Sequence, residues 1–276
     1  MLSASSTTSE STIEICGACH EEQYLRVSSA HALLDDGGEW QDQWGFESSC
    51  VACHGDARAH IDSGGSIETM VGFTEDEPAP VRWSACLTCH SDDHAGFPLS
   101  SHARAGFACA TCHEVHAPRP TANLLKPARP MDARLGAGSA TCAECHGDVV
   151  TQFAFNERHR LQEGSISCVD CHNPHQASAR TRLASFKQQA CTTCHADVDG
   201  PFVFEHGASR VEGCVACHTP HGGPNRHMLK FQNVHDTCYS CHAVVPGFHL
   251  NFSRETNCSN CHSTIHGSNF DPAFLK

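Results

Sequence analysis

The chain has 276 residues, including 20 cysteines, 21 glycines and 13 prolines. Only 7% of its residues are aromatic, which is too few for an ordinary side-chain core in a chain of this length. Its formal charge is −13, and residues 1–100 hold 17 acidic and 3 basic side chains, against 14 and 15 in residues 101–276. This distribution argues against nucleic-acid binding, and no apolar run approaches the ~20 residues that a membrane-spanning helix needs.

The acidic charge is concentrated at the N-terminal end of the chain. One interpretation is that it keeps the protein soluble. The other is that it steers a positively charged partner to this end of the molecule.

Residues 1–15 have neither a basic start nor an apolar stretch, so they are not a signal peptide. We expect this segment to be extended or disordered.

All cysteines occur in ten Cys-x-x-Cys-His motifs. Two thiols at this spacing form thioethers with the two vinyl groups on one edge of a porphyrin, and the next histidine falls under the iron as its proximal ligand. Ten motifs therefore predict ten haem c groups. Because haem c is normally attached outside the cytoplasmic membrane, we expect that a native signal peptide has been removed and that the mature protein is periplasmic or associated with the outer membrane. The predicted attachment residues are Cys16, Cys19, Cys50, Cys53, Cys86, Cys89, Cys109, Cys112, Cys142, Cys145, Cys168, Cys171, Cys191, Cys194, Cys214, Cys217, Cys238, Cys241, Cys258 and Cys261. The proximal histidines are His20, His54, His90, His113, His146, His172, His195, His218, His242 and His262.

Two other interpretations of the cysteines are weaker. Cys-x-x-Cys pairs also build structural zinc sites, but zinc does not require the histidine that follows the second cysteine in all ten motifs. A disulfide framework would vary its spacings.

The motifs fall into five pairs, and each pair is the basis of a repeat. A repeat contains a first motif, a middle histidine, a second motif and a tail histidine. The five repeats cover residues 16–60, 86–116, 142–175, 191–221 and 238–266. Repeat one is the least regular, because an insertion at 33–49 holds two of the three tryptophans and its tail histidine is offset.

The middle and tail histidines are the predicted distal ligands. In repeats two to five the middle histidine lies 7–9 residues before the second motif, and in repeats two to four the tail histidine lies three residues after the proximal one. The predicted distal ligands are His31, His60, His102, His116, His159, His175, His206, His221, His249 and His266. Histidine on both faces of the iron leaves no open position for a substrate, which indicates a single-electron carrier.

The tail histidine lies close behind a proximal histidine. Three extended residues span only about 10 Å, so the tail ring is not expected to reach the far face of its own haem. For His116, His175 and His221 we therefore favour the first haem of the same repeat. The chain has three further histidines, His94, His227 and His235, and we expect these to be surface residues or propionate contacts.

The fold predicted from these features is a multihaem cytochrome c, mostly irregular, with short α-helices and little β structure. It is an elongated haem wire built from five dihaem repeats, with the haems in place of a side-chain core. Residues 117–140 are rich in proline and form a predicted connector. It separates four haems at 16–116 from six at 141–266, which a C-terminal tail at 267–276 follows.

The ten motifs and their paired organisation resemble those of the MtrA/DmsE-type periplasmic decahaem cytochromes. So do the segments Cys-Val-Asp-Cys-His-Asn-Pro-His at 168–175 and Cys-Val-Ala-Cys-His-Thr-Pro-His at 214–221. The resemblance covers residues 16–266. It implies a staggered haem wire that carries electrons between the periplasm and the cell exterior. The implied partners are an outer-membrane β-barrel that sheathes the wire and other multihaem cytochromes.

Two other functions remain as alternatives. A multihaem enzyme that converts nitrite or hydroxylamine needs an open iron, and the offset tail histidine of repeat one is the weakest ligand. A subunit of an extracellular cytochrome filament would share a ligand across a subunit interface, which the three further histidines permit.

Overall fold

The computed structural model describes residues 12–26, 31, 49–116, 125, 135, 137–176, 189–253 and 255–275. Residues 1–11, the insertion apart from Ser49 and most of the connector at 117–140 lie outside the described residues. The chain forms two compact units. The N-terminal unit consists of residues 1–127 and 174–177, and the C-terminal unit consists of residues 128–173 and 178–276.

Each motif folds as a turn of helix. In eight motifs the backbone N–H of the histidine donates to the carbonyl of the first cysteine at 2.9–3.0 Å, and the other two motifs lie within longer helices. Positions i, i+3 and i+4 share one face of such a turn. Each motif therefore presents two thiols and one imidazole on the same side through local structure alone.

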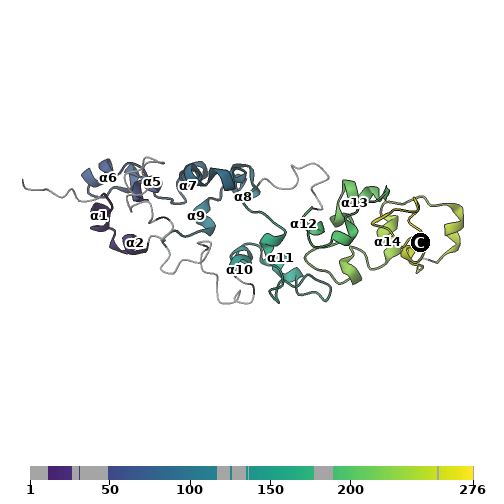
Figure 1. Cartoon of the computed structure of the whole chain (residues 1–276). Helices are drawn as coiled ribbons and strands as arrows, with labels where there is room; N and C mark the ends of the chain where they lie inside the picture. Colours follow the sequence, from purple (N-terminus) through teal and green to yellow (C-terminus); the bar gives the residue numbers. More distant parts are fainter. Residues whose placement is uncertain are drawn as a thin grey trace, which may run out of the picture. The chain divides into compact units, whose positions relative to one another are not determined.

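The described residues of the N-terminal unit form mostly short helices (Figure 1). Its longest helix, α7, begins after Pro78 and carries a proline in its first turn, where the missing N–H costs little. The backbone of α7 departs from helical geometry at His90 (φ −95°, ψ 23°), the proximal histidine of its motif. The elements are α1 (Thr12–Gly17), α2 (Glu21–Arg26), α5 (Ser49–His54), α6 (Arg58–Asp62), η2 (Ile67–Thr69), α7 (Ala79–His94), η3 (Phe97–Leu99), α8 (Ser101–Arg104) and α9 (Cys109–Cys112).

The C-terminal unit has the same character. Its strands β1 and β2 pair antiparallel, with Phe204 opposite Ser268 and Glu205 opposite Gly267. The elements are α10 (Ala137–Ala143), α11 (Gly147–Gln152), η5 (Cys168–Asp170), α12 (Gln189–Thr192), η8 (Ala196–Val198), β1 (Phe204–Glu205), α13 (Gly207–Val211), η9 (Cys214–Ala216), η10 (Arg226–Met228), α14 (Val234–Tyr239), η11 (Gly247–Asn251), η12 (Cys258–Asn260) and β2 (Gly267–Ser268). The prediction of short helices with little β structure is confirmed for the described residues.

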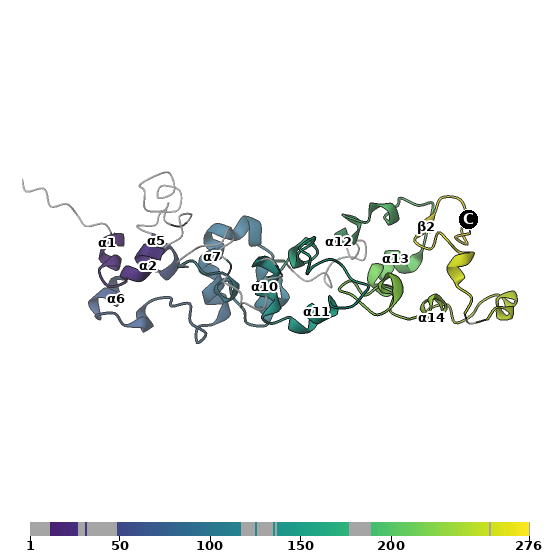
Figure 2. The same ribbon diagram turned by 90° about the horizontal axis from the view of Figure 1, so that it is seen from below.

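Among the described residues, side-chain packing is confined to small clusters. In the C-terminal unit, Leu135, Ala140, Phe153 and Leu161 form a buried cluster beside α10 and α11, which pack against each other (Figure 2). In the N-terminal unit the buried hydrophobic residues are Ala57, Phe97 and Ala108. Over the described ranges, no helix combines the length and the apolar character that crossing a membrane requires.

Residues 267–275 pack against earlier segments of the C-terminal unit, to which they belong. Besides the pairing of β1 with β2, the side-chain carbonyl of Asn269 accepts a hydrogen bond from the backbone of Val203 at 2.9 Å. The carbonyl of Ala273 lies 2.6 Å from Nδ1 of His262, a predicted proximal histidine. The last residues therefore hold the tenth motif in place.

Gly222 follows the tail histidine of repeat four at a position that only glycine fits. Its φ is +148°, and an added Cβ would overlap the backbone carbonyl of Gln152. We expect Gly222→Ala to lower the free energy of unfolding of the haem-loaded protein by about 3 kcal/mol, through backbone strain and overlap. Denaturant titration measures this loss.

Gly247→Ala is the matched control, because no atom lies within 4 Å of its added Cβ and its φ is not in the left-handed range. We expect this substitution to change the free energy of unfolding by less than about 0.5 kcal/mol. Equal losses for the two variants would contradict the assignment of strain to Gly222.

Candidate functional site

Histidine rings face one another in pairs throughout both units. In nine pairs, a predicted proximal histidine faces a predicted distal one, with ring centres 5.8–6.4 Å apart. The pairs are His20–His60, His54–His116, His90–His31, His113–His175, His172–His221, His195–His159, His218–His266, His242–His206 and His262–His249.

This spacing fits one metal ion between two imidazoles. A metal–imidazole nitrogen bond is about 2.0 Å long, and the ring nitrogen lies about 1.1 Å from the ring centre, so trans ligands place their ring centres about 6.2 Å apart. Rings in direct stacking contact lie closer, as do those of His235 and Tyr239 at 4.1 Å. The spacing of the pairs therefore leaves room for one metal ion between the two rings.

Backbone carbonyls orient several of these rings. The Nδ1 atoms of five of them lie within 2.6–3.0 Å of a carbonyl oxygen. A ring that donates from Nδ1 keeps Nε2 free as the metal ligand, and the carbonyl raises the basicity of the ligand. The pairs are His54 with Val71, His60 with Ser66, His159 with Pro220, His218 with His227, and His262 with Ala273.

Burial keeps many of the predicted distal rings neutral. It is the largest cause that lowers the pKa of six of them, with neighbouring histidines next, and the pKa of His175 falls to about 4. Neutral imidazole is the form that binds a metal. The six are His31, His116, His175, His206, His221 and His266.

Most pairs join two different repeats. The tail histidine of each of repeats two to five faces the second motif of the preceding repeat. The middle histidines of repeats one, three and four face the first motif of the following repeat. Neighbouring repeats are thus interlocked by their histidines.

The expectation that His116, His175 and His221 serve the first motif of their own repeat is wrong. Their rings face the second motif of the preceding repeat instead. The proximal rings of the first motifs in repeats two and four already face middle histidines from the preceding repeats. The three-residue spacing does keep each of these tail rings away from the proximal histidine of its own motif. The proximal histidine that the ring does reach belongs to the preceding repeat.

In repeats one and five, one histidine pair forms within the repeat. His60, the offset tail histidine of repeat one, faces the first motif of its own repeat at His20. His249, the middle histidine of repeat five, faces the second motif of its own repeat at His262. The irregular spacing of repeat one thus accompanies a different pairing. Two predicted ligands remain: His102, whose ring lies beside Phe107, and His146.

The three further histidines occupy three different environments. His94 lies one helical turn after His90 in α7, and its ring centre is 6.0 Å from that of His90 and 4.2 Å from that of His175. The i, i+4 spacing of His94 from a proximal histidine is the sequence signal that places it beside the ligands. His235 stacks on Tyr239. His227 contributes its backbone, because its carbonyl accepts from His218.

The cysteines place consecutive motifs side by side. In repeats two, four and five, the thiols of the first cysteines of the two motifs lie next to each other. For example, the neighbouring thiol of Cys109 is the main cause that lowers the pKa of Cys86, to about 7. Burial, and then the neighbouring thiols of Cys86 and Cys89, raise the pKa of Cys53 to about 11, so the second and third motifs are neighbours too.

Comparison with known proteins identifies the chemistry of these motifs. Residues 206–246 match a family model described as a doubled CXXCH motif, and residues 101–196 match one described as cytochrome c3. The chain is 34% identical to the multiheme cytochrome MtrA of Shewanella baltica (strain OS185) over 237 residues. This aligned region covers 80% of this chain and 68% of that protein. The chain therefore binds haem c through Cys-x-x-Cys-His motifs, and the protein is a multihaem electron-transfer cytochrome. The chain belongs to the MtrA-type multihaem cytochromes.

Proposed function

We propose that this chain is a decahaem electron carrier in which every iron has two histidine ligands. The twenty cysteines named above attach ten haems, and the ten proximal and ten distal histidines, including His102 and His146, ligate them. The observation that carries this proposal is the set of nine ring pairs at 5.8–6.4 Å. Haem c, when bound with two histidines, accepts and donates one electron at a time.

The motifs are arranged as the proposed wire of five dihaem repeats requires. In the N-terminal unit, α1 packs against α5, α5 against α7, and α7 against α9, so the first four motifs follow one another in chain order. In the C-terminal unit α10 packs against η5, and thiols of the sixth to tenth motifs are electrostatic neighbours in sequence order. This packing supports the proposal that consecutive haems within each unit lie close enough for electron transfer.

The proposed setting is a porin–cytochrome conduit of the outer membrane. Membership of the MtrA-type family supports a periplasmic location, an outer-membrane β-barrel as partner and other multihaem cytochromes as electron donors and acceptors. The acidic residues 1–100 suit a basic redox partner at the N-terminal end.

The filament and enzyme alternatives receive no comparable support. At the nine motifs with pairs, both rings belong to this chain, so these motifs need no ligand from a second copy. In repeat one, where the enzyme alternative would place an open iron, the second motif has His116 opposite its proximal His54.

Spin quantification tests the proposal directly. In low-temperature EPR of the oxidised protein we expect ten low-spin irons per chain and no high-spin iron, because two imidazoles give a strong ligand field. The haem content of the same sample, measured as the pyridine haemochrome, should also equal ten per chain. One or more high-spin irons per chain would contradict ligation of every iron by two histidines.

A further inference from the structure

The loop after the eighth motif contacts the ligands of three successive motifs. His218 is the proximal histidine of this motif, and the tail histidine His221 faces His172 of the sixth. The carbonyl of Pro220, between them, lies 2.6 Å from Nδ1 of His159, which faces His195 of the seventh motif. Residues 218–228 therefore contain or contact predicted ligands of the sixth, seventh and eighth motifs.

This loop is closed by antiparallel pairing at its two ends. The backbone N–H of Thr219 donates to the carbonyl of Met228 at 2.8 Å, and that of Lys230 donates to the carbonyl of Cys217 at 2.9 Å. His218 thus lies opposite Leu229. The side chain of His218 is bound as well, because its Nδ1 lies 2.8 Å from the carbonyl of His227 at the end of the loop.

The backbone that supplies this carbonyl is strained. His227 and Met228 have φ values of 58° and 53°, in the left-handed region that residues with a Cβ rarely occupy. Such a conformation persists only where the surrounding structure holds it. Some contact must therefore stabilise His227 in the conformation that places its carbonyl at His218.

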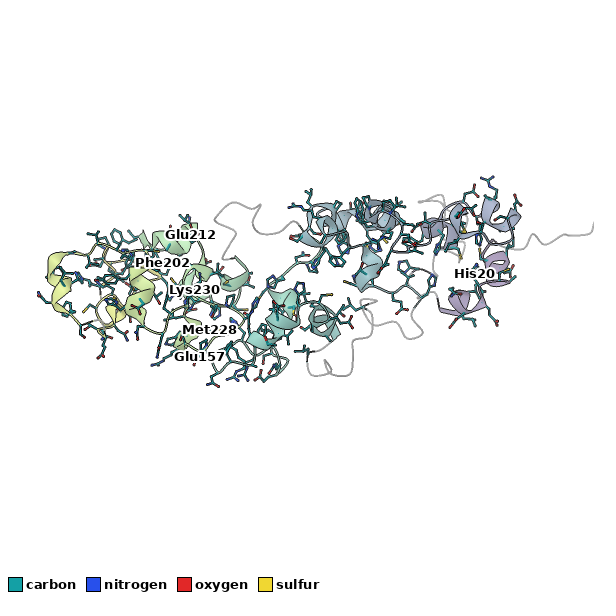
Figure 3. The ribbon with its side chains drawn as sticks, turned by 180° about the vertical axis from the view of Figure 1, so that it is seen from behind. His20, Glu157, Phe202, Glu212, Met228 and Lys230 are labelled. Carbon is teal, nitrogen blue, oxygen red and sulfur yellow. The ribbon has the colours of Figure 1, made fainter. Side chains whose placement is uncertain are left out.

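Glu157 provides that contact. Its carboxylate accepts a hydrogen bond of 2.8 Å from the backbone N–H of His227, across 70 residues of sequence. The backbone carbonyl of Glu157 accepts a hydrogen bond of 2.9 Å from the N–H of Gly223. The backbone and the side chain of Glu157 thus both bind the loop. Figure 3 shows Glu157 and Met228 close to each other, whereas Glu212 lies on another side of the C-terminal unit.

We propose that Glu157 is a positioning residue for His218, acting through the left-handed backbone of His227. The proposal rests on the proposed function, because it takes His218 as an iron ligand. The carboxylate holds the N–H of His227, and the carbonyl of His227 in turn receives the Nδ1–H of His218. A carbonyl acceptor makes the imidazole more basic and favours ferric iron. Glu157 therefore lowers the reduction potential of the haem at Cys214–His218.

The experiment is a potentiometric titration of the haem-loaded protein followed by EPR. We expect Glu157→Ala to raise the midpoint potential of one haem in ten and to move the g values of that haem alone. Glu157→Gln retains a carbonyl oxygen that accepts from His227, so its shift should be smaller. Glu212→Ala removes an exposed carboxylate two residues before the same motif and serves as the control for charge, with no change of g values expected.

A double variant tests the path through the backbone. Glycine adopts positive φ without strain, so His227→Gly in the Glu157→Ala background should restore the g values and potential of the wild type. Unchanged spectra in Glu157→Ala, an equal shift in Glu212→Ala or a failure of His227→Gly to rescue would each overturn the proposal. Haem content and low-spin count in the wild type test the proposed function separately, because neither depends on Glu157.

Discussion

Without attached haem, the chain should remain unfolded at neutral pH and show no cooperative transition on addition of denaturant. Among the described residues only seven hydrophobic side chains are buried, and Phe97, Leu135, Phe153 and Leu161 are the large ones. Full burial of one such side chain contributes about 1.5–3 kcal/mol, whereas ordering the backbone of one residue costs about 1–2 kcal/mol. These few side chains cannot offset the ordering of a chain of 276 residues.

Haem attachment changes this balance in two ways. Each porphyrin adds a large apolar surface for the protein to cover, and each pair of ligands joins segments that are distant in sequence. His172 and His221, for example, lie in different repeats but face each other at 6.0 Å. Folding is thus coupled to the cofactor, as in small domains that fold only with their metal.

The measurement compares three samples by far-UV circular dichroism and amide hydrogen exchange. They are the haem-loaded protein, the wild-type chain produced without haem attachment and kept reduced, and a variant in which all twenty cysteines are alanine. We expect protected amides only in the first. Slow amide exchange in either haem-free sample would show that the polypeptide has a stable core of its own.

Removal of a tail histidine should open an iron in the preceding repeat. His221→Ala takes away the ring that faces His172, while the ring of His195 in repeat four keeps His159 opposite it. We expect one iron in ten to become high-spin in the oxidised protein and, after reduction, to bind carbon monoxide. The other nine should stay low-spin, because their pairs do not include His221.

Two backgrounds locate that iron. In a variant without Cys168 and Cys171, no haem is attached beside His172, so adding His221→Ala should produce no new high-spin iron. In a variant without Cys191 and Cys194, adding His221→Ala should still produce one. The reverse pattern would mean that His221 serves the first motif of its own repeat and would contradict the pairing between repeats. Haem counts of nine per chain confirm that each background is otherwise intact.

The sequence was sufficient to predict the parts of the site that depend on local structure. The spacing of Cys-x-x-Cys-His makes each motif a helical turn with its thiols and imidazole on one face, and the structure has this turn. Spacing also identified the ligand candidates among the histidines outside the motifs, since nine predicted distal rings each face a predicted proximal ring. Scarcity of aromatic residues likewise indicated small side-chain clusters.

The pairing between repeats could not be predicted in the same way. A tail histidine three residues behind its motif has the same spacing whether it serves its own repeat or the one before. What decides is the distance between segments far apart in sequence, such as His218 and His266. The left-handed backbone conformation of His227 could not be predicted either, because neither His227 nor Met228 is a glycine or an asparagine, the residues that usually adopt it. The contact of Glu157 with His227 depends on tertiary structure alone.

The staggered pairing of histidines limits how such a chain can change in length during evolution. Cutting the chain after repeat four would remove His266 and leave His218 unpaired, although every residue of repeat four itself would remain. Duplicating an internal repeat, in contrast, supplies one new tail and one new middle histidine for the two new motifs. The first and last repeats pair within themselves, through His60 and His249, and so act as ends. If the paired histidines ligate iron as proposed, cytochromes of this design can grow by insertion between their terminal repeats, whereas loss of a terminal repeat would leave an iron without its second ligand.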